Sequence, residues 1–163
     1  QIPSENLIGI EGEGFKYAMS ALNGGRIGIA AQSIGIAEAA FNAALRYSKT
    51  RKAFGTEISN HQAIQFKLAE MAADIEAAKL LTYKAAYLED TDKNYNMASA
   101  IAKLKASKTA VNCALESVQI HGGYGYVREY LVERFLRDSK VTEIYEGTSE
   151  IQKIIIFREL MKL

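Results

Sequence analysis

The sequence has little proline or cysteine, with one residue of each among its 163 residues. The proline is Pro3, so no later proline forces a helix to break. The cysteine is Cys113, which excludes an internal disulfide bond and any metal site that needs several cysteines. We expect Cys113 to be a small buried thiol on an apolar helix face.

An excess of charge of either sign is also absent, because 20 basic and 19 acidic residues leave a formal net charge of +1. These charges are interspersed and form no basic stripe, so we expect no nucleic acid partner. The longest apolar runs, at residues 27–31 and 154–157, are far too short to span a bilayer. A composition of 48% hydrophobic and 24% charged residues is typical of a globular domain.

The sequence begins with glutamine, and we expect no targeting segment in its first residues. We therefore expect residues 1–13 to be a connector from an upstream domain of a longer protein, with a true mature amino terminus as the alternative. Residues 14–163 then form one domain.

Apolar residues recur every three to five positions over three long stretches, which predicts three long helices. The first ends near Lys49, and small residues crowd its middle, where we expect another backbone or a ligand to approach. The second follows a turn at residues 51–60 and begins with a capping box of Ser59 and Gln62. The third carries apolar residues from Met97 to Val118 and ends at Gly122.

Two shorter helical segments follow, at residues 129–139 and after a link at residues 141–148. A second capping box, of Ser149 and Gln152, opens the last helix. Long helices joined by short turns predict an all-α fold, an up-and-down antiparallel four-helix bundle with extra C-terminal helices.

The two histidines, His61 and His121, have no spacing that makes a metal site or a catalytic triad, so we expect packing or capping roles and no metal. The glycine-rich stretch at residues 122–125 follows a helix rather than a strand, which excludes a dinucleotide loop. It is either a helix end with a tight turn or a place where a ligand or second chain approaches the backbone.

Two further stretches each have two interpretations. At residues 51–55, the cations complement the helix dipole, which we favour, or Arg51 grips a phosphate while Phe54 flanks a flat ring. At residues 144–150, Glu146 is a base in a partly apolar cleft, with Thr148, Ser149 and free amides binding an anion. The alternative is a capped helix preceded by a solvated glutamate.

Five motifs in this order resemble the C-terminal helical domain of the acyl-CoA dehydrogenase family, from Gly12 to the end of the chain. They are Leu22-Asn23-Gly24-Gly25-Arg26, Arg51-Lys52-Ala53-Phe54-Gly55, His61-Gln62, Gln119-Ile120-His121-Gly122-Gly123-Tyr124-Gly125 and Tyr145-Glu146-Gly147-Thr148-Ser149-Glu150.

The resemblance implies an FAD-dependent oxidoreductase of fatty acid β-oxidation that converts a short-chain acyl-CoA to trans-2-enoyl-CoA. Glu146 matches the base that removes the α-proton while flavin N5 takes the β-hydride. Some relatives carry the base just before the arginine of the first motif, where this chain has Gly25. Substrate-binding positions are matched by Asn23, Arg26 and Gly147, and flavin-binding positions by Arg51, Phe54, Gln62, Gln119, Gly122, Gly123, Thr148, Ser149 and Glu150.

The resemblance also implies partners: an electron-transferring flavoprotein as acceptor, and further copies of the chain in a homotetramer. Several of the flavin positions then reach the flavin of a neighbouring subunit. A bacterial cytoplasm or a mitochondrial matrix fits the family, and the isolated domain is expected to be inactive and to bind FAD weakly. The rival hypotheses are an acyl-CoA oxidase and a non-catalytic helical assembly module.

Overall fold

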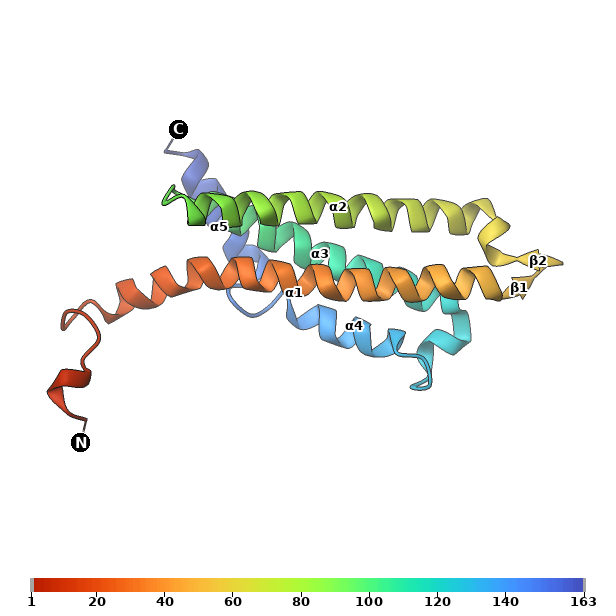
Figure 1. Cartoon of the computed structure of the whole chain (residues 1–163), viewed down its shortest axis with the longest axis horizontal. Coiled ribbons are helices and arrows are strands. Elements are labelled where there is room, and N and C mark those ends of the chain that lie inside the picture. Colours follow the sequence, from red (N-terminus) through yellow and green to blue (C-terminus); the bar gives the residue numbers. More distant parts are fainter. Residues whose placement is uncertain (1, 163) are drawn as a thin grey trace.

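The computed structural model describes residues 2–162 (Figure 1). Over this range the α-helices are α1 (Gly14–Thr50), α2 (Gln62–Asp90), α3 (Asn96–His121), α4 (Val132–Val141) and α5 (Ser149–Leu160). A two-stranded antiparallel hairpin of β1 (Lys52–Ala53) and β2 (Thr56–Glu57) follows α1, with three 3-10 turns, η1 (Ser4–Asn6), η2 (Ile58–Asn60) and η3 (Gly122–Tyr126). No helix in the described range is long and apolar enough to cross a membrane.

The helices run up and down in sequence order, as Figure 1 shows for α1, α2 and α3 along the long axis. The shorter α4 runs back along α1 and α3. The last helix, α5, packs on α3 at the end of the bundle that lies away from the β1–β2 hairpin. The predicted all-α fold, an up-and-down antiparallel four-helix bundle with extra C-terminal helices, is therefore confirmed, and within the described range α5 is the one α-helix beyond the four. The first turns of α1 extend beyond the bundle, where Phe15 is 78% exposed.

The core between α1 and α3 is built mainly of small residues. Its fully buried alanines are Ala30, Ala37, Ala40 and Ala44 on α1 and Ala100, Ala102, Ala106, Ala110 and Ala114 on α3. The hydroxyl of Ser117 donates directly to the backbone carbonyl of Ala40, 2.9 Å away, so these two helices approach closely. Cys113 is buried in the same region, as predicted, and burial raises the pKa of its thiol to about 12.

The buried face of α3 differs from the one that its large apolar residues indicate. Leu115 is 50% exposed, whereas Lys103 and Ser107 are fully buried beside the alanines. The reason is that α3 packs against α1, α2, α4 and α5, and close packing of several helices requires small side chains at their contacts.

Both predicted capping boxes are wrong in the structure. The residue that precedes α2 is His61, and Ser59 instead accepts a bond at its backbone carbonyl from the Gln65 side chain. At α5 the cap is Thr148, one residue earlier than predicted, and its hydroxyl accepts from the amide of Ile151. Thr148 and Ser149 are both residue types that cap helices, so at α5 the residue type alone does not select the one that caps.

Two loops also differ in detail from the prediction. The segment after α1 forms a hairpin that turns at Phe54 and Gly55, both with positive φ, and α4 begins at Val132 rather than at residue 129. The α3 helix ends at Gly122 as predicted, with φ 60° and ψ −138°, a conformation that favours glycine.

Candidate functional site

The centre of the site is a turn at Glu146 and Gly147, between α4 and α5. A hydrogen bond from the Ser149 amide to the Glu143 carbonyl, 3.0 Å long, closes the loop around it. Both residues adopt positive φ, 53° for Glu146 and 88° for Gly147. A left-handed glutamate is uncommon and costs about 1–3 kcal/mol, and such strained residues cluster at functional sites.

Two buried side chains lie beneath this turn and donate to its carbonyl groups. The Lys103 ammonium on α3 donates to the Gly147 oxygen at 2.8 Å. The Gln152 amide on α5 donates to the Gly147 oxygen at 2.8 Å and to the Glu146 oxygen at 3.2 Å. Within residues 2–162 no acceptor pairs with the backbone amides of Glu146, Gly147 and Thr148, so these three donors are available to a ligand.

The Glu146 carboxylate lies against α1 at Gly25. A methyl group added to Gly25 would lie only 2.8 Å from the Glu146 Oε2 atom. At Gly25 the group that approaches the first helix is therefore the side chain of Glu146, rather than the backbone or ligand that we expected. The carboxylate is half-buried, which suits a group that must contact a ligand.

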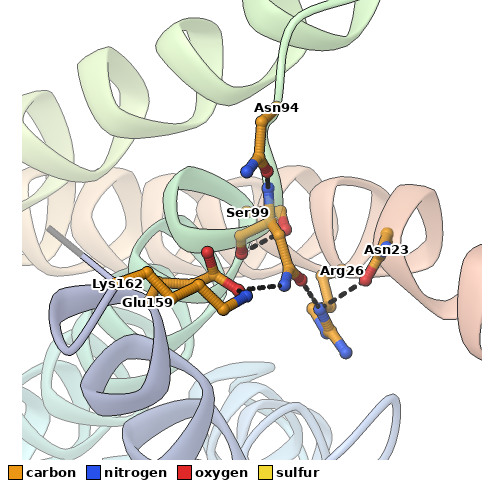
Figure 2. A network of polar contacts seen from close by, with 7 residues as sticks. Asn23, Arg26, Asn94, Ser99, Glu159 and Lys162 are labelled. Atoms are coloured by element: carbon orange, nitrogen blue, oxygen red, sulfur yellow. Dashed lines mark hydrogen bonds and ion pairs between the residues drawn. The ribbon is translucent and has the colours of Figure 1, made fainter.

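A polar network beside Glu146 holds Arg26, which is 6% exposed. Its Nη1 atom donates to the Asn23 and Asn96 side-chain oxygens at 2.7 and 3.1 Å. Figure 2 shows this chain of contacts continuing to Glu159 of α5, which accepts from the Asn96 amide at 2.9 Å and from Lys162 at 2.7 Å. The Arg26 Nε atom is buried and has no hydrogen-bond partner among residues 2–162.

Charge of both signs meets in this region. Burial lowers the pKa of Arg26, and the nearby negative charge of Glu146 opposes that shift. Burial also lowers the pKa of Lys103, opposed mainly by Glu143 and Glu146. Two buried cations and amides that are unpaired in the described range lie near Glu146, and Glu143 is also close to Lys103. Such a set of donors suits a ligand that carries or develops negative charge on oxygen.

A second candidate region lies at the far end of α1, where a cavity of ≈ 730 Å³ opens between the end of α1, η2 and the end of α3 with the segment that follows it. It is lined by Tyr47, Arg51, Ile58, Ile120, His121, Gly122, Gly123, Tyr124, Val127, Glu129 and Tyr130. The Arg51 guanidinium lies 5.6 Å from the centre of the Tyr124 ring. Exposed glycines, aromatic rings and a cation suit a flat ring joined to phosphate.

The two histidines have packing roles, as predicted. The His121 ring stacks on Tyr47 with centroids 4.2 Å apart, and its Nδ1 atom lies 2.7 Å from the Ser117 carbonyl. His61 contacts the Ala53 carbonyl and lies edge-on to Phe54. No group of three metal-ligating side chains occurs in the part of the chain that the structure describes.

The structure divides the predicted site residues into two groups. Near Glu146 lie Asn23, Arg26, Gly147, Thr148, Ser149 and Glu150; at the far end of α1 lie Arg51, Phe54, Gln62, Gln119, Gly122 and Gly123. Phe54 is 97% exposed. Gly25 and Arg51 lie at two ends of one helical stretch, about 39 Å apart at the α-helical rise of 1.5 Å per residue. The two groups of one chain therefore belong to separate binding surfaces.

Sequence reasoning missed Lys103, Asn96 and Glu159 and gave Gln152 only a capping role. The one available signal for Lys103 is its spacing, because it lies three residues from Ala100 and from Ala106 on a face of small residues. Asn96 and Glu159 gave no signal, since the contact of Asn96 with Arg26 depends on how α3 packs against α1, and its contact with Glu159 on how α5 packs against α3.

The chain is similar to proteins of known activity. Residues 12–161 match the family model for the acyl-CoA dehydrogenase C-terminal domain. A short-chain specific acyl-CoA dehydrogenase of Clostridium acetobutylicum is 50% identical, over 99% of this chain and 42% of that protein. An acryloyl-CoA reductase (NADH) of Anaerotignum propionicum is 52% identical, over 99% of this chain and 41% of that protein.

A solved structure extends this similarity to the fold. Butyryl-CoA dehydrogenase from Megasphaera elsdenii is 51% identical with a TM-score of 0.97, over 98% of this chain and 42% of that chain. The chain spans about two fifths of the length of the curated relatives that it matches, which include bacterial and mitochondrial proteins.

Proposed function

Because the chain belongs to the acyl-CoA dehydrogenase family, as its C-terminal domain, we propose that it supplies the catalytic base of an FAD-dependent acyl-CoA dehydrogenase. The reaction converts a short-chain acyl-CoA to trans-2-enoyl-CoA. The observation that carries this proposal is the Glu146 carboxylate, held by a strained turn against Gly25 beside unpaired backbone amides.

Glu146 takes the α-proton of the acyl thioester in this proposal. An ordinary glutamate carboxylate, with a pKa of about 4.3, is too weak a base for a thioester α-carbon unless the thioester oxygen is polarised. The amide of Glu146 is one donor for that oxygen, because no described residue accepts from it. Gly147 lines the thioester, and Arg26 with Asn23 holds the CoA portion.

The residues around Glu146 and at the far end of α1 fit a flavin dinucleotide. A bound FAD would supply the acceptor for the β-hydrogen, which leaves as a hydride. Thr148, Ser149 and Glu150 provide hydroxyls and the amides of a helix N-terminus on the side of the base. Arg51, with the remaining predicted flavin residues, serves the flavin of a neighbouring copy, because it is too far along α1 to share a ligand with Glu146.

The substrate class and partners are part of the same proposal. Relatives described as short-chain specific and as butyryl-CoA dehydrogenase support a short acyl chain. We assign electron transfer to an electron-transferring flavoprotein, a homotetramer as the assembly, and the bacterial cytoplasm or mitochondrial matrix as the location. The helical domain alone is inactive, because the remaining three fifths of the length of its relatives are needed to enclose substrate and flavin.

A second function is favoured by one comparison. The relative described as acryloyl-CoA reductase (NADH) is as similar as the dehydrogenases. The same base and oxyanion donors serve the reverse reaction, in which Glu146 returns a proton to the α-carbon. The direction of electron flow then distinguishes the two functions.

Anaerobic flavin bleaching in the full-length enzyme tests the proposal. Short acyl-CoAs should bleach the flavin of the wild type rapidly, and Glu146→Gln should lower that rate by at least about 10³-fold, because the amide cannot take a proton. Failure of every acyl-CoA to bleach bound FAD would support the non-catalytic module. Fast reoxidation of the reduced flavin by air would support the oxidase. Fast reduction of the flavin by NADH would support the reductase.

A further inference from the structure

Beneath the turn that carries Glu146, the structure places two polar side chains where apolar packing is the rule. Lys103 and Gln152 are both 0% exposed, and Lys103 is among the largest fully buried side chains of the chain. Lysine is almost never fully buried unless it is paired. The partner of its ammonium group is not a carboxylate but the carbonyl oxygen of Gly147, 2.8 Å away.

The two side chains fix two consecutive peptide planes. Gln152 binds the Glu146 carbonyl and shares the Gly147 carbonyl with Lys103. In a planar trans peptide the C=O and the following N–H point in opposite directions. The N–H groups of Gly147 and Thr148 therefore point away from the Lys103 and Gln152 side chains. This orientation explains why neither amide donates to any residue in the described range.

The same contacts hold an unfavourable backbone conformation. Glu146 has a φ of 53°, and a side chain on Gly147 would meet the Gln152 amide nitrogen at 2.8 Å. Without the donors beneath it, the turn is free to relax to a conformation of lower energy. The carboxylate would then leave its place over Gly25.

Resting on the proposed function, we propose that Lys103 and Gln152 are positioning residues of the reaction, which hold the Glu146 carboxylate and the following amides in their reactive arrangement. Neither side chain contacts the substrate in this proposal. Both act through the backbone of the turn, from α3 and α5.

The test uses the full-length FAD enzyme and two variants, Lys103→Met and Gln152→Met. Methionine keeps most of the volume of each side chain and removes the donor. Lys105→Met is the matched control, because Lys105 is on the same helix but pairs with Asp74. Anaerobic stopped-flow reduction by butyryl-CoA gives the limiting rate of flavin reduction and, from its saturation, the Kd of the substrate.

We expect each variant to lower the limiting rate of flavin reduction by about 10- to 100-fold, with Kd changed by less than about three-fold, because a base displaced by about 1 Å loses rate rather than affinity. An α-deuterated substrate should show a larger isotope effect in the variants, since proton removal becomes slower. The control should keep the wild-type rate and isotope effect.

Limiting rates near that of the wild type in both variants, with FAD bound, would overturn the inference. Loss of bound FAD or of the assembly in both variants would also overturn it, because the pair would then serve the fold and not the base. An unreactive wild type would instead overturn the proposed function itself. The wild-type measurement thus separates the two failures.

Discussion

The Gly25 position carries the first prediction at the scale of single residues. Gly25→Ala should stabilise α1 by about 0.5–1 kcal/mol, because alanine favours a helix over glycine. Its methyl group would lie 2.8 Å from the flexible end of Glu146, so the carboxylate moves and the fold does not. We expect a melting temperature at or above that of the wild type and a rate of flavin reduction about 10- to 100-fold lower.

Gly28→Ala is the matched control for this prediction. Gly28 lies on the same helix, and nothing is within 4 Å of a methyl group added there. It should raise the melting temperature without changing the rate. An unchanged rate in Gly25→Ala would contradict the placement of the carboxylate over α1.

At this scale the sequence identifies residues with recognisable motifs and misses those that act through packing. Glu146 could be singled out as a candidate because its neighbours form a distinctive motif before a helix. Lys103 could not, because its role depends on the helix face that is buried, and the large apolar residues of α3 indicate a different face. Arg26 donates to Asn96 on α3, which in turn donates to Glu159 on α5, and no spacing in the sequence relates these three residues.

At the scale of helices, the cap of α5 provides the second prediction. Thr148→Ala should destabilise the start of this helix by about 1 kcal/mol, whereas Ser149→Ala should have almost no effect. The reason is that the Thr148 hydroxyl accepts from the Ile151 amide. Melting temperatures of the two variants measure the difference, and equal losses would mean that both hydroxyls cap the helix.

The end of α3 gives the third prediction, which concerns pH. Burial lowers the pKa of His121, with a smaller opposing effect of the Ser117 carbonyl. The imidazole of His121 therefore binds a proton more tightly in the unfolded chain than in the native one. Neutral His121 contributes fully to the free energy of unfolding above the ordinary histidine pKa of about 6.5, and this contribution declines as the pH falls below that value.

His121→Phe checks this prediction, because phenylalanine keeps a flat ring against Tyr47 and does not titrate. Melting temperatures at pH 7.5 and at pH 5.5 are the measurement. The wild type should lose more than the variant between these two conditions. Equal losses would show that other groups account for the whole pH dependence.

Helix number and order could be predicted from the sequence, because the periodicity of the long helices extends over many turns. The predicted first helix ends near Lys49, and α1 ends at Thr50. Helix starts are harder to predict, since serine is the better capping residue by type but the cap of α5 is Thr148. The hairpin after α1 is too short for its alternation to be recognised.

At the scale of the whole molecule, the two separated groups of flavin residues give the fourth prediction. The isolated chain of 163 residues should not retain stoichiometric FAD. One copy of the chain provides two groups of flavin residues, which lie about 39 Å apart along α1, and each group forms only half of a flavin site. Absorbance at flavin wavelengths after gel filtration is the measurement, and one FAD per chain would contradict the division of the site.

The contact between α1 and α3 is lined by alanines, so larger side chains destabilise this part of the core more than smaller ones do. Most cores lose stability when a large side chain is truncated, because a cavity remains. Along this contact there is little side-chain volume to remove, and each added methyl group at Ala37 or Ala110 forces two closely packed helices apart. Random mutation therefore damages this domain mainly through gains in side-chain size, and an alanine scan would leave most of its core unprobed.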